Sequence, residues 1–299
     1  MKKVIITGSN GLLGQTLVNL LMKDPTNYLV VGLSKGENRM KRNDFSYYNV
    51  DITNYDHLRA CISDIQPSFI INTAAMTNVD ICEVKPKECN QLNLEAVKYL
   101  TLICTELKIH LIQISTDFIF DGTDGIYKET DPPNPLSIYG NSKLKAEHIV
   151  INSQVNFTIL RTILVYGKVD RSKRSNIVLW VKEMLENNKE ISIVSDQFRM
   201  PTYVEDLATA CKLVIDKEAK GVYHISSNEL LSVFEIANQI ATVFKLNKKL
   251  IKSVSTKTLN QKAIRPLKTG FDLSKTIKDL EFHPTSFLEG LERFKQTLS

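Results

Sequence analysis

The sequence predicts an α/β fold with a doubly wound parallel sheet and a smaller C-terminal region that is partly interleaved with it. Short runs rich in Ile and Val alternate with segments of helical periodicity through the first 165 residues. This alternation is typical of strand–helix–strand units. Several runs are apolar on both faces, as expected for parallel strands that helices cover on each side.

Short apolar runs mark the predicted strands of the sheet, at residues 3–7, 29–33, 47–50, 69–73, 110–115 and 157–161. A first helix is predicted after Gly11, where leucines recur at helical spacing. A longer helix is predicted through residues 94–107 and a third over residues 137–150. Crossovers between parallel strands are right-handed by default, so these helices should cover the sheet.

The later part of the sequence is less regular. Helices are predicted at 176–186, 204–215, 233–243 and within 284–298, and strands at 191–194 and 222–226. Basic residues after Tyr166-Gly167 interrupt the apolar pattern; they are Lys168, Arg171, Lys173 and Arg174. We therefore expect two parts, residues 1–165 and residues 166–299, the second partly interleaved with the first.

Composition narrows the functional classes. Of the 299 residues, 43% are apolar and 24% charged, which excludes an intrinsically disordered chain. No apolar run approaches the ~20 residues of a membrane helix, and residues 4–6 are too short an apolar run for a secretory signal. The five cysteines are odd in number and lack Cys-x-x-Cys spacing, which argues against a disulfide framework or a zinc site and favours the cytoplasm.

The net charge is mild. An excess of +5 would suit an anionic small molecule, but mild basicity is more often a property of an ordinary solvated surface. No run of Lys and Arg alternates with aromatic residues, so a nucleic-acid partner is not expected. No convincing carboxylate cluster predicts a metal site.

A glycine-rich loop follows the first predicted strand and opens the first helix. Its spacing is Gly-x-x-Gly-x-x-Gly, at Gly8, Gly11 and Gly14. A glycine turn of this kind can be purely structural, but its place between strand and helix is typical of dinucleotide binding by a Rossmann fold. The pyrophosphate would meet amides at the helix N-terminus. The expected cofactor-binding positions of the loop are Gly8, Asn10, Gly11, Leu12, Leu13 and Gly14.

The second predicted strand indicates which dinucleotide binds. An acid at the end of this strand usually binds the ribose 2′-hydroxyl of NAD. Here the strand ends in Ser34 and Lys35, which could bind a 2′-phosphate, so NADP(H) is favoured and use of NAD(H) as well stays open. Further cofactor contacts are expected where later strands end, at Asp51, Ile52, Ala74 and Ala75.

A catalytic group is predicted from three side chains. Thr116 ends the fifth predicted strand, and Tyr139 precedes Lys143 by four residues, which places the two on one helix face. A neighbouring ammonium should pull the pKa of Tyr139 down from its free value of ~10. Thr116 could then hold a carbonyl oxygen while Tyr139 delivers a proton to it. The spacing alone occurs by chance, and its position after a dinucleotide loop gives it weight.

These motifs together resemble the extended short-chain dehydrogenase/reductase superfamily. Finer stretches are similar to dTDP-4-dehydrorhamnose reductases; they are STDFIFDG at 115–122, ETD at 129–131, PLSIYG at 135–140, and parts of 161–167 and 201–208. The resemblance covers nearly the whole chain, densely up to residue 208 and thinly beyond it.

The resemblance implies reduction of the 4-keto group of a nucleotide-linked deoxysugar, with NADPH as donor and dTDP-L-rhamnose as product. It implies that Thr116, Tyr139 and Lys143 are catalytic, that the last two also touch the cofactor, and that the part after residue 165 binds substrate. It leaves a homodimer open. The substrate-binding residues that it implies are Met76, Asp117, Phe118, Arg199, Thr202 and Arg265.

Two alternatives remain at this stage. Sugar-nucleotide 4,6-dehydratases carry Asp-Glu after the catalytic Thr, whereas Phe118 follows Asp117 here, and epimerases usually end the second strand in an acid. The same family also includes a regulatory subunit of methionine adenosyltransferase, which binds NADP and a partner protein. This sequence keeps Thr116, Tyr139 and Lys143, so it retains the means for catalysis.

Overall fold

The computed structural model describes residues 1–171, 176–259 and 261–298. Its centre is a seven-stranded sheet in the order β10-β7-β5-β4-β1-β2-β3, with every neighbouring pair parallel. The strands are β1 (Lys2–Thr7), β2 (Tyr28–Ser34), β3 (Ser46–Asn49), β4 (Phe69–Asn72), β5 (His110–Thr116), β7 (Phe157–Thr162) and β10 (Gly221–Ile225). The order reverses beside β1, which is the topology of a doubly wound fold.

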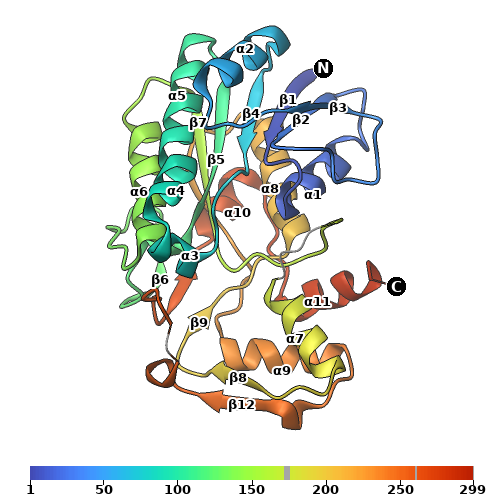
Figure 1. The fold of residues 1–299 in the computed structure, drawn as a ribbon, viewed down its shortest axis with the longest axis vertical. Helices are drawn as coiled ribbons and strands as arrows, with labels where there is room; N and C mark the ends of the chain where they lie inside the picture. The colour runs from blue at the N-terminus through green and yellow to red at the C-terminus, as the bar shows by residue number, and fades with distance from the viewer. Residues whose placement is uncertain (172–175, 260, 299) are drawn as a thin grey trace.

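Helices cover both faces of this sheet (Figure 1). One face carries α2 (Tyr55–Ile65), α5 (Ala96–Glu106) and α6 (Ile138–Ile151), whose apolar side chains pack on Ile5, Ile70 and Leu111. The other face carries α1 (Leu12–Leu21) and α8 (Val204–Lys217), which pack on Val4, Ile6 and Ile112. This two-sided burial explains why the central strands are apolar on both faces.

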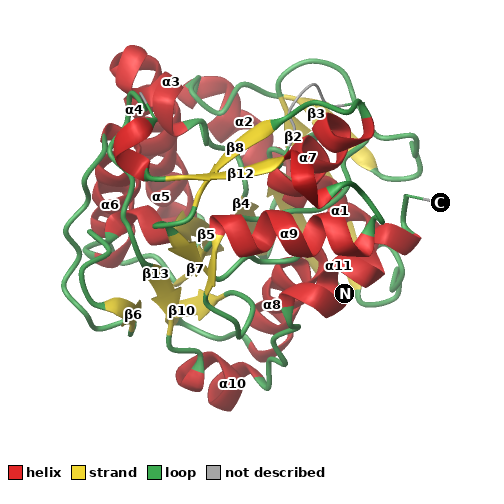
Figure 2. Cartoon of the chain, turned by 90° about the horizontal axis from the view of Figure 1, so that it is seen from below, coloured by secondary structure: helices red, strands yellow, loops and turns green. Residues whose placement is uncertain are grey.

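Below the sheet lies a smaller layer made by the later part of the chain (Figures 1 and 2). It joins short sheets to helices: α7 (Ile177–Glu186), β8 (Ile191–Val194), β9 (Phe198–Arg199), β11 (Leu231–Ser232), α9 (Val233–Val243), β12 (Ile251–Val254) and α11 (Phe287–Gln296). Strands β8 and β12 pair in parallel, and β9 and β11 pair antiparallel. Figure 2, seen from below, shows α9 crossing this layer.

The remaining elements are short. They are α3 (Val79–Val84), α4 (Pro86–Asn90), a π-helical turn at Gln91–Glu95, β6 (Gly125–Tyr127), β13 (Thr269–Phe271), α10 (Ser274–Leu280) and 3₁₀ turns at Asp117–Ile119, Lys248–Leu250 and Thr256–Thr258. Strand β13 pairs with β6, although the two are far apart in the sequence.

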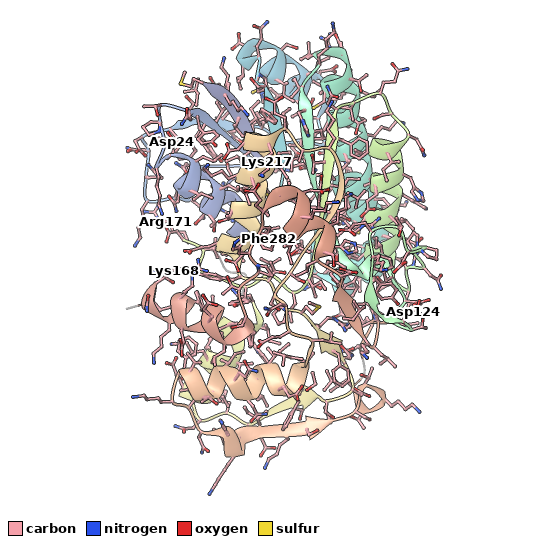
Figure 3. All side chains as sticks on the ribbon, turned by 180° about the vertical axis from the view of Figure 1, so that it is seen from behind. Asp24, Asp124, Lys168, Arg171, Lys217 and Phe282 are labelled. Carbon is pink, nitrogen blue, oxygen red and sulfur yellow. The ribbon has the colours of Figure 1, made fainter. Side chains whose placement is uncertain are left out.

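The two halves of the chain are interleaved. Strand β10 hydrogen-bonds with β7 at the edge of the main sheet, and α8 packs against α1. Both elements come from beyond residue 165, so the sheet is completed by the later half. A domain boundary after residue 165 stays a prediction. Of the basic residues expected there, Lys173 and Arg174 lie outside the described residues, whereas Lys168 lies between α1 and α11 (Figure 3), where its ammonium donates to the carbonyl of Thr297 at 2.7 Å.

The structure also bears on the cysteines, on membrane-spanning helices and on metal ligands. All five cysteines are free thiols. Among the described residues, no helix is long and apolar enough to cross a membrane, and no three His, Cys, Asp or Glu side chains gather as metal ligands.

Candidate active site

The glycine loop packs tightly between β1 and α1. Gly8 has a φ of 65°, and the amide of Gly11 donates to its carbonyl at 2.8 Å. A Cβ on Gly14 would lie 2.3 Å from that same carbonyl oxygen, and one on Gly8 would lie 2.8 Å from the amide nitrogen of Ala74. Glycine is therefore required at both places, because backbone approaches backbone there.

The start of α1 is open to a ligand. Gly11 is the N-cap residue and offers no side-chain hydrogen bond to the first turn. The unpaired amides of a helix N-terminus, with the positive end of the helix dipole, favour an anion such as a pyrophosphate. Ala74 and Ala75 face the same space with small side chains. This cradle fits the dinucleotide that the motif predicts.

One cavity of about 650 Å³ connects the glycine loop to the predicted catalytic residues. Its wall brings together most of the expected cofactor, catalytic and substrate positions; these are Gly11, Leu12, Leu13, Ala74, Ala75, Thr116, Asp117, Phe118, Tyr139, Lys143, Arg199 and Arg265. The cavity runs along the carboxyl ends of the sheet strands, where open α/β sheets bind ligands.

Tyr139 and Lys143 are held by the first turns of α6. The hydroxyl of Ser137 caps this helix by accepting from the amide of Gly140 at 3.1 Å. Both site residues are buried, at 8% and 4% exposure, and the ammonium of Lys143 donates to the carbonyl of Ile114 on β5 at 2.6 Å. Helix α6 is thereby fixed to the strand that carries Thr116.

The expected lowering of the pKa of Tyr139 is wrong for this structure. Burial raises the pKa of Tyr139 well above its ordinary value, and the Asp117 carboxylate raises it further, although a hydrogen bond with Thr116 opposes them. The ammonium of Lys143 is directed to the Ile114 carbonyl, and burial lowers its own pKa to about 8. Tyr139 is therefore a neutral phenol at pH 7, which is the protonation state of a proton donor.

Asp117 lies deep beside Thr116. Its carboxylate accepts hydrogen bonds from the hydroxyls of Thr269 and Thr116, and it lies 3.7 Å from the guanidinium of Arg199. Burial raises the pKa of Asp117, and the Arg199 cation opposes the rise. Arg199 is itself buried at 4% exposure and lies over the ring of Phe118 at 5.8 Å. Asp117, Phe118 and Arg199 all line the cavity.

Arg265 also lines the cavity. It pairs with Asp80 at 2.6 Å, and Asp80 also accepts from the amide of Ala263 at 3.0 Å. Because Asp80 lies on α3, this pair ties the segment around residue 265 to the main domain.

The remaining expected positions do not line the cavity. Thr202 is 1% exposed, and its hydroxyl donates to the carbonyl of Ile163 at 2.8 Å, which joins two backbone segments. Met76 packs with Cys82, Cys89 and Tyr139 behind the wall. The structure shows packing and backbone contacts for these two residues, and their contact with a ligand stays a prediction.

Ser34 and Lys35, which were expected to bind the 2′-phosphate of the cofactor, are not among the residues that line the cavity. Lys35 is exposed and pairs with Asp51 at 2.7 Å, and the Ser34 hydroxyl accepts from the amide of Asn10 at 3.1 Å. The Asn10 side chain bonds to the segment after β2, accepting from the amide of Arg39 at 2.8 Å. Ile52 is buried in the core. Gly8 and Gly14 lie against neighbouring backbone within the loop. The pair of Lys35 and Asp51 was not predicted, because the two were assigned separate roles.

Sequence reasoning also missed Asn93. It lies in the π-helical turn before α5 at 1% exposure, and its amide bonds to both the amide and the carbonyl of Met76. It also donates to the hydroxyl of Ser142 on α6 at 3.2 Å. No sequence signal singled it out, because Gln91 and Glu95 on either side are also polar. Other cavity residues that sequence reasoning did not assign to the site are Asn176, Gln197 and Gln261.

Curated relatives divide between two kinds of protein. The chain is 33% identical over 250 residues to methionine adenosyltransferase 2 subunit beta of Bos taurus, covering 82% of this chain and 73% of that one. It is 32% identical over 271 residues to the probable low-salt glycan biosynthesis reductase Agl14 of Haloferax volcanii, covering 90% and 89%. It is 30% identical over 307 residues to dTDP-4-dehydrorhamnose reductase of Aggregatibacter actinomycetemcomitans, covering 99% of each chain.

Solved structures share the whole architecture. The dTDP-4-dehydrorhamnose reductase of Bacillus anthracis in complex with NADP superposes with a TM-score of 0.87 at 30% identity, covering 99% of each chain. A reductase ortholog of Clostridium acetobutylicum gives 0.88 at 27% identity, again over 99% of each chain. The family model described as the RmlD substrate binding domain matches residues 1–299. The chain belongs to the RmlD substrate-binding domain family, on an extended short-chain dehydrogenase/reductase fold.

Proposed function

We propose that this protein reduces the 4-keto group of a nucleotide-linked deoxysugar with NADPH, and that its substrate is dTDP-4-dehydrorhamnose. One observation carries the proposal: Thr116, Tyr139 and Lys143 share a cavity wall with the glycine loop. The full-length similarity to dTDP-4-dehydrorhamnose reductases supports this choice of substrate.

The residues divide the chemistry between them. NADPH, when bound, supplies the hydride to the carbonyl carbon. The hydroxyls of Thr116 and Tyr139 would bind the carbonyl oxygen, and Tyr139, neutral because burial raises its pKa, would donate its proton to that oxygen. The ammonium of Lys143, one helical turn away, would stabilise the phenolate that remains. Arg199 and Arg265 offer positive charge to the substrate end of the cavity.

A panel of 4-keto sugar nucleotides tests this proposal. We expect loss of NADPH absorbance with dTDP-4-dehydrorhamnose, slower loss when the base or the sugar is changed, and a product identical to dTDP-L-rhamnose by NMR. No NADPH consumption with any member of the panel, by a protein that binds NADPH, contradicts the reductase function.

The similarity to methionine adenosyltransferase 2 subunit beta favours a second candidate, an NADP-binding regulatory subunit. This function needs a stable complex with the catalytic chain of a methionine adenosyltransferase and no turnover of a sugar. Co-elution of the two chains in size-exclusion chromatography, with changed kinetics of the transferase, would support it. Separate elution together with turnover of the sugar nucleotide favours the reductase.

A further inference from the structure

A buried ion pair lies directly behind the catalytic group and has no part in the steps above. Glu147 is on α6, one helical turn beyond Lys143, and Arg161 is on β7. They are 1% and 5% exposed. Burying two charges costs free energy that their attraction repays only with good geometry and further hydrogen bonds.

The geometry of this pair is good. The guanidinium of Arg161 donates from Nη2 to Glu147 Oε2 at 2.7 Å and from Nε to both carboxylate oxygens at 3.1 and 3.2 Å. The hydroxyl of Ser115 donates to Glu147 Oε1. All of these partners of the carboxylate are hydrogen-bond donors. Because Ser115 precedes Thr116 on β5, the pair connects α6, β5 and β7 at the catalytic end of the sheet.

The Nη1 atom of Arg161, which does not contact Glu147, also has polar neighbours. It donates to the carbonyl of Glu129 at 3.2 Å and lies 3.4 Å from His224 Nε2. The other ring nitrogen of His224 lies 3.1 Å from the carbonyl of Tyr127, so Nδ1 carries the proton and Nε2 accepts. The pKa of His224 is held well below its ordinary value by burial and by the Arg161 cation, so the ring stays neutral.

We propose, on the basis of the reductase function above, that Glu147 is a positioning residue: its carboxylate, anchored by Arg161, keeps the ammonium of Lys143 charged and fixes the end of β5 that presents Thr116. Without a nearby negative charge, a lysine this deeply buried favours its neutral form. A neutral Lys143 could not stabilise the phenolate left by proton transfer.

The groups around Lys143 single out Glu147 as the source of that charge. Burial lowers the pKa of Lys143 to about 8, and the Glu147 carboxylate is the larger of the influences that oppose the fall. Cys89, on α4, raises the pKa of Lys143 by less than Glu147 does. From β5, the carbonyl of Ile114 accepts a hydrogen bond from the Lys143 ammonium. Tyr139, on the same helix, is neutral because its pKa is raised.

The test measures the titration of Lys143 directly. Lysines carrying ¹³C at Cε are followed by NMR from pH 6 to 11 on the full chain, and Lys143 is assigned by the signal missing from Lys143→Arg. In Glu147→Gln we expect its midpoint to fall by about one pH unit, since one nearby charge is lost. The alkaline limb of kcat/KM for the sugar nucleotide should move by the same amount. In Glu147→Asp, which keeps the charge, both should stay near their original values.

An unchanged Lys143 midpoint in Glu147→Gln overturns the proposal, and so does an equal shift in Glu147→Asp. If Glu147→Gln fails to fold because Arg161 is left unpaired, the double variant Glu147→Gln/Arg161→Met replaces it. Its Lys143 midpoint must still fall, but by less than a full unit, because the Arg161 cation is lost together with the carboxylate. The NMR readout needs no substrate. Failure of the wild-type protein to turn over any sugar nucleotide therefore refutes the reductase function separately.

Discussion

The side chains around Tyr139 determine its protonation state. Its ring packs among Cys82, Cys89 and Phe118, and the resulting loss of solvent raises the pKa of its hydroxyl. The sequence placed Tyr139 and Lys143 one helical turn apart, and the structure agrees. It could not predict that the ammonium turns to the Ile114 carbonyl, because that contact depends on how closely α6 approaches β5.

Replacing Tyr139 with Phe removes the proposed proton donor and little volume. We expect kcat/KM for the sugar nucleotide to fall about 10²–10⁴-fold, the usual contribution of a positioned acid. NADPH affinity, measured by fluorescence titration, should change little. Tyr99→Phe removes a hydroxyl on α5, away from the cavity, and serves as the control. Turnover within a few-fold of wild type in Tyr139→Phe would mean that another group donates the proton.

Lys35 tests the preference for NADPH. Its ammonium is exposed and paired with Asp51, so it is available to a 2′-phosphate. In Lys35→Glu we expect the ratio of kcat/KM for NADPH to that for NADH to fall about tenfold or more, because a carboxylate repels the phosphate. Lys41→Glu makes the same charge change elsewhere in the segment after β2. Equal ratios in Lys35→Glu and wild type would exclude Lys35 from cofactor selection.

At the scale of elements, strongly periodic segments were predictable and short paired strands were not. Helix α6 (Ile138–Ile151) and strand β8 (Ile191–Val194) lie within a residue of the predicted bounds. Strands β6 and β13 are three residues long and form a two-stranded sheet with each other, so neither carries a local signal. The helix predicted through 94–107 begins instead as a π-helical turn that directs Asn93 toward α6.

The packing of α1 on the glycine loop gives an element-scale prediction. In Gly14→Ala the new methyl group would collide with the Gly8 carbonyl and with Cα of Ser9 at 2.7 Å, forcing α1 away from the loop. We expect a loss of about 1–3 kcal/mol in the free energy of unfolding. NADPH affinity should also fall at least about tenfold, since the helix N-terminus moves.

Gly221→Ala is the matched control for this prediction. Gly221 has a φ of 98°, and its nearest neighbour for a new Cβ is 3.8 Å away. It therefore adds backbone strain without a collision, far from the loop. Urea unfolding should show lower stability with NADPH affinity retained. Wild-type affinity in Gly14→Ala would contradict the assignment of the loop to the cofactor.

At the scale of the whole molecule, the two halves of the chain share one core. The sequence predicted an interleaved second part, but not that β10 would extend the main sheet beyond β7. The apolar pattern of β10 is compatible with any buried strand. Which strand it pairs with depends on the packing of the complete molecule. The cavity likewise needs both halves, since Tyr139 comes from one and Arg199 from the other. For this reason the substrate end was less predictable than the catalytic end.

Two buried histidines predict how global stability depends on pH. Burial lowers the pKa of His110 to about 4, and burial beside Arg161 lowers that of His224. Both stay neutral in the fold but gain protons when unfolded, so their stabilisation is present above pH 6.5 and is lost as pH falls toward 4. Between pH 7 and pH 5 the loss from His110 should be about 2 kcal/mol in the free energy of unfolding, and His224 should add to it in the same direction.

Urea unfolding at pH 7, 6 and 5 measures this loss. In His110→Gln the free energy of unfolding should fall less between pH 7 and pH 5, because the contribution of His110 is missing. His148→Gln, at an exposed position on α6, should show the same fall as the wild-type protein. Equal slopes for His110→Gln and wild type would mean that His110 also titrates in the folded protein.

Hydride transfer to the sugar tests the central claim most directly. NADPH carrying deuterium at the transferable position of the nicotinamide is mixed with dTDP-4-dehydrorhamnose and the protein, and the product is examined by NMR. We expect deuterium at C4 of the sugar in stoichiometric amount with the wild-type protein, and at least about a hundredfold slower incorporation with Tyr139→Phe. Unlabelled C4 and unconsumed cofactor with the wild-type protein, under conditions where NADPH is bound, would contradict the account.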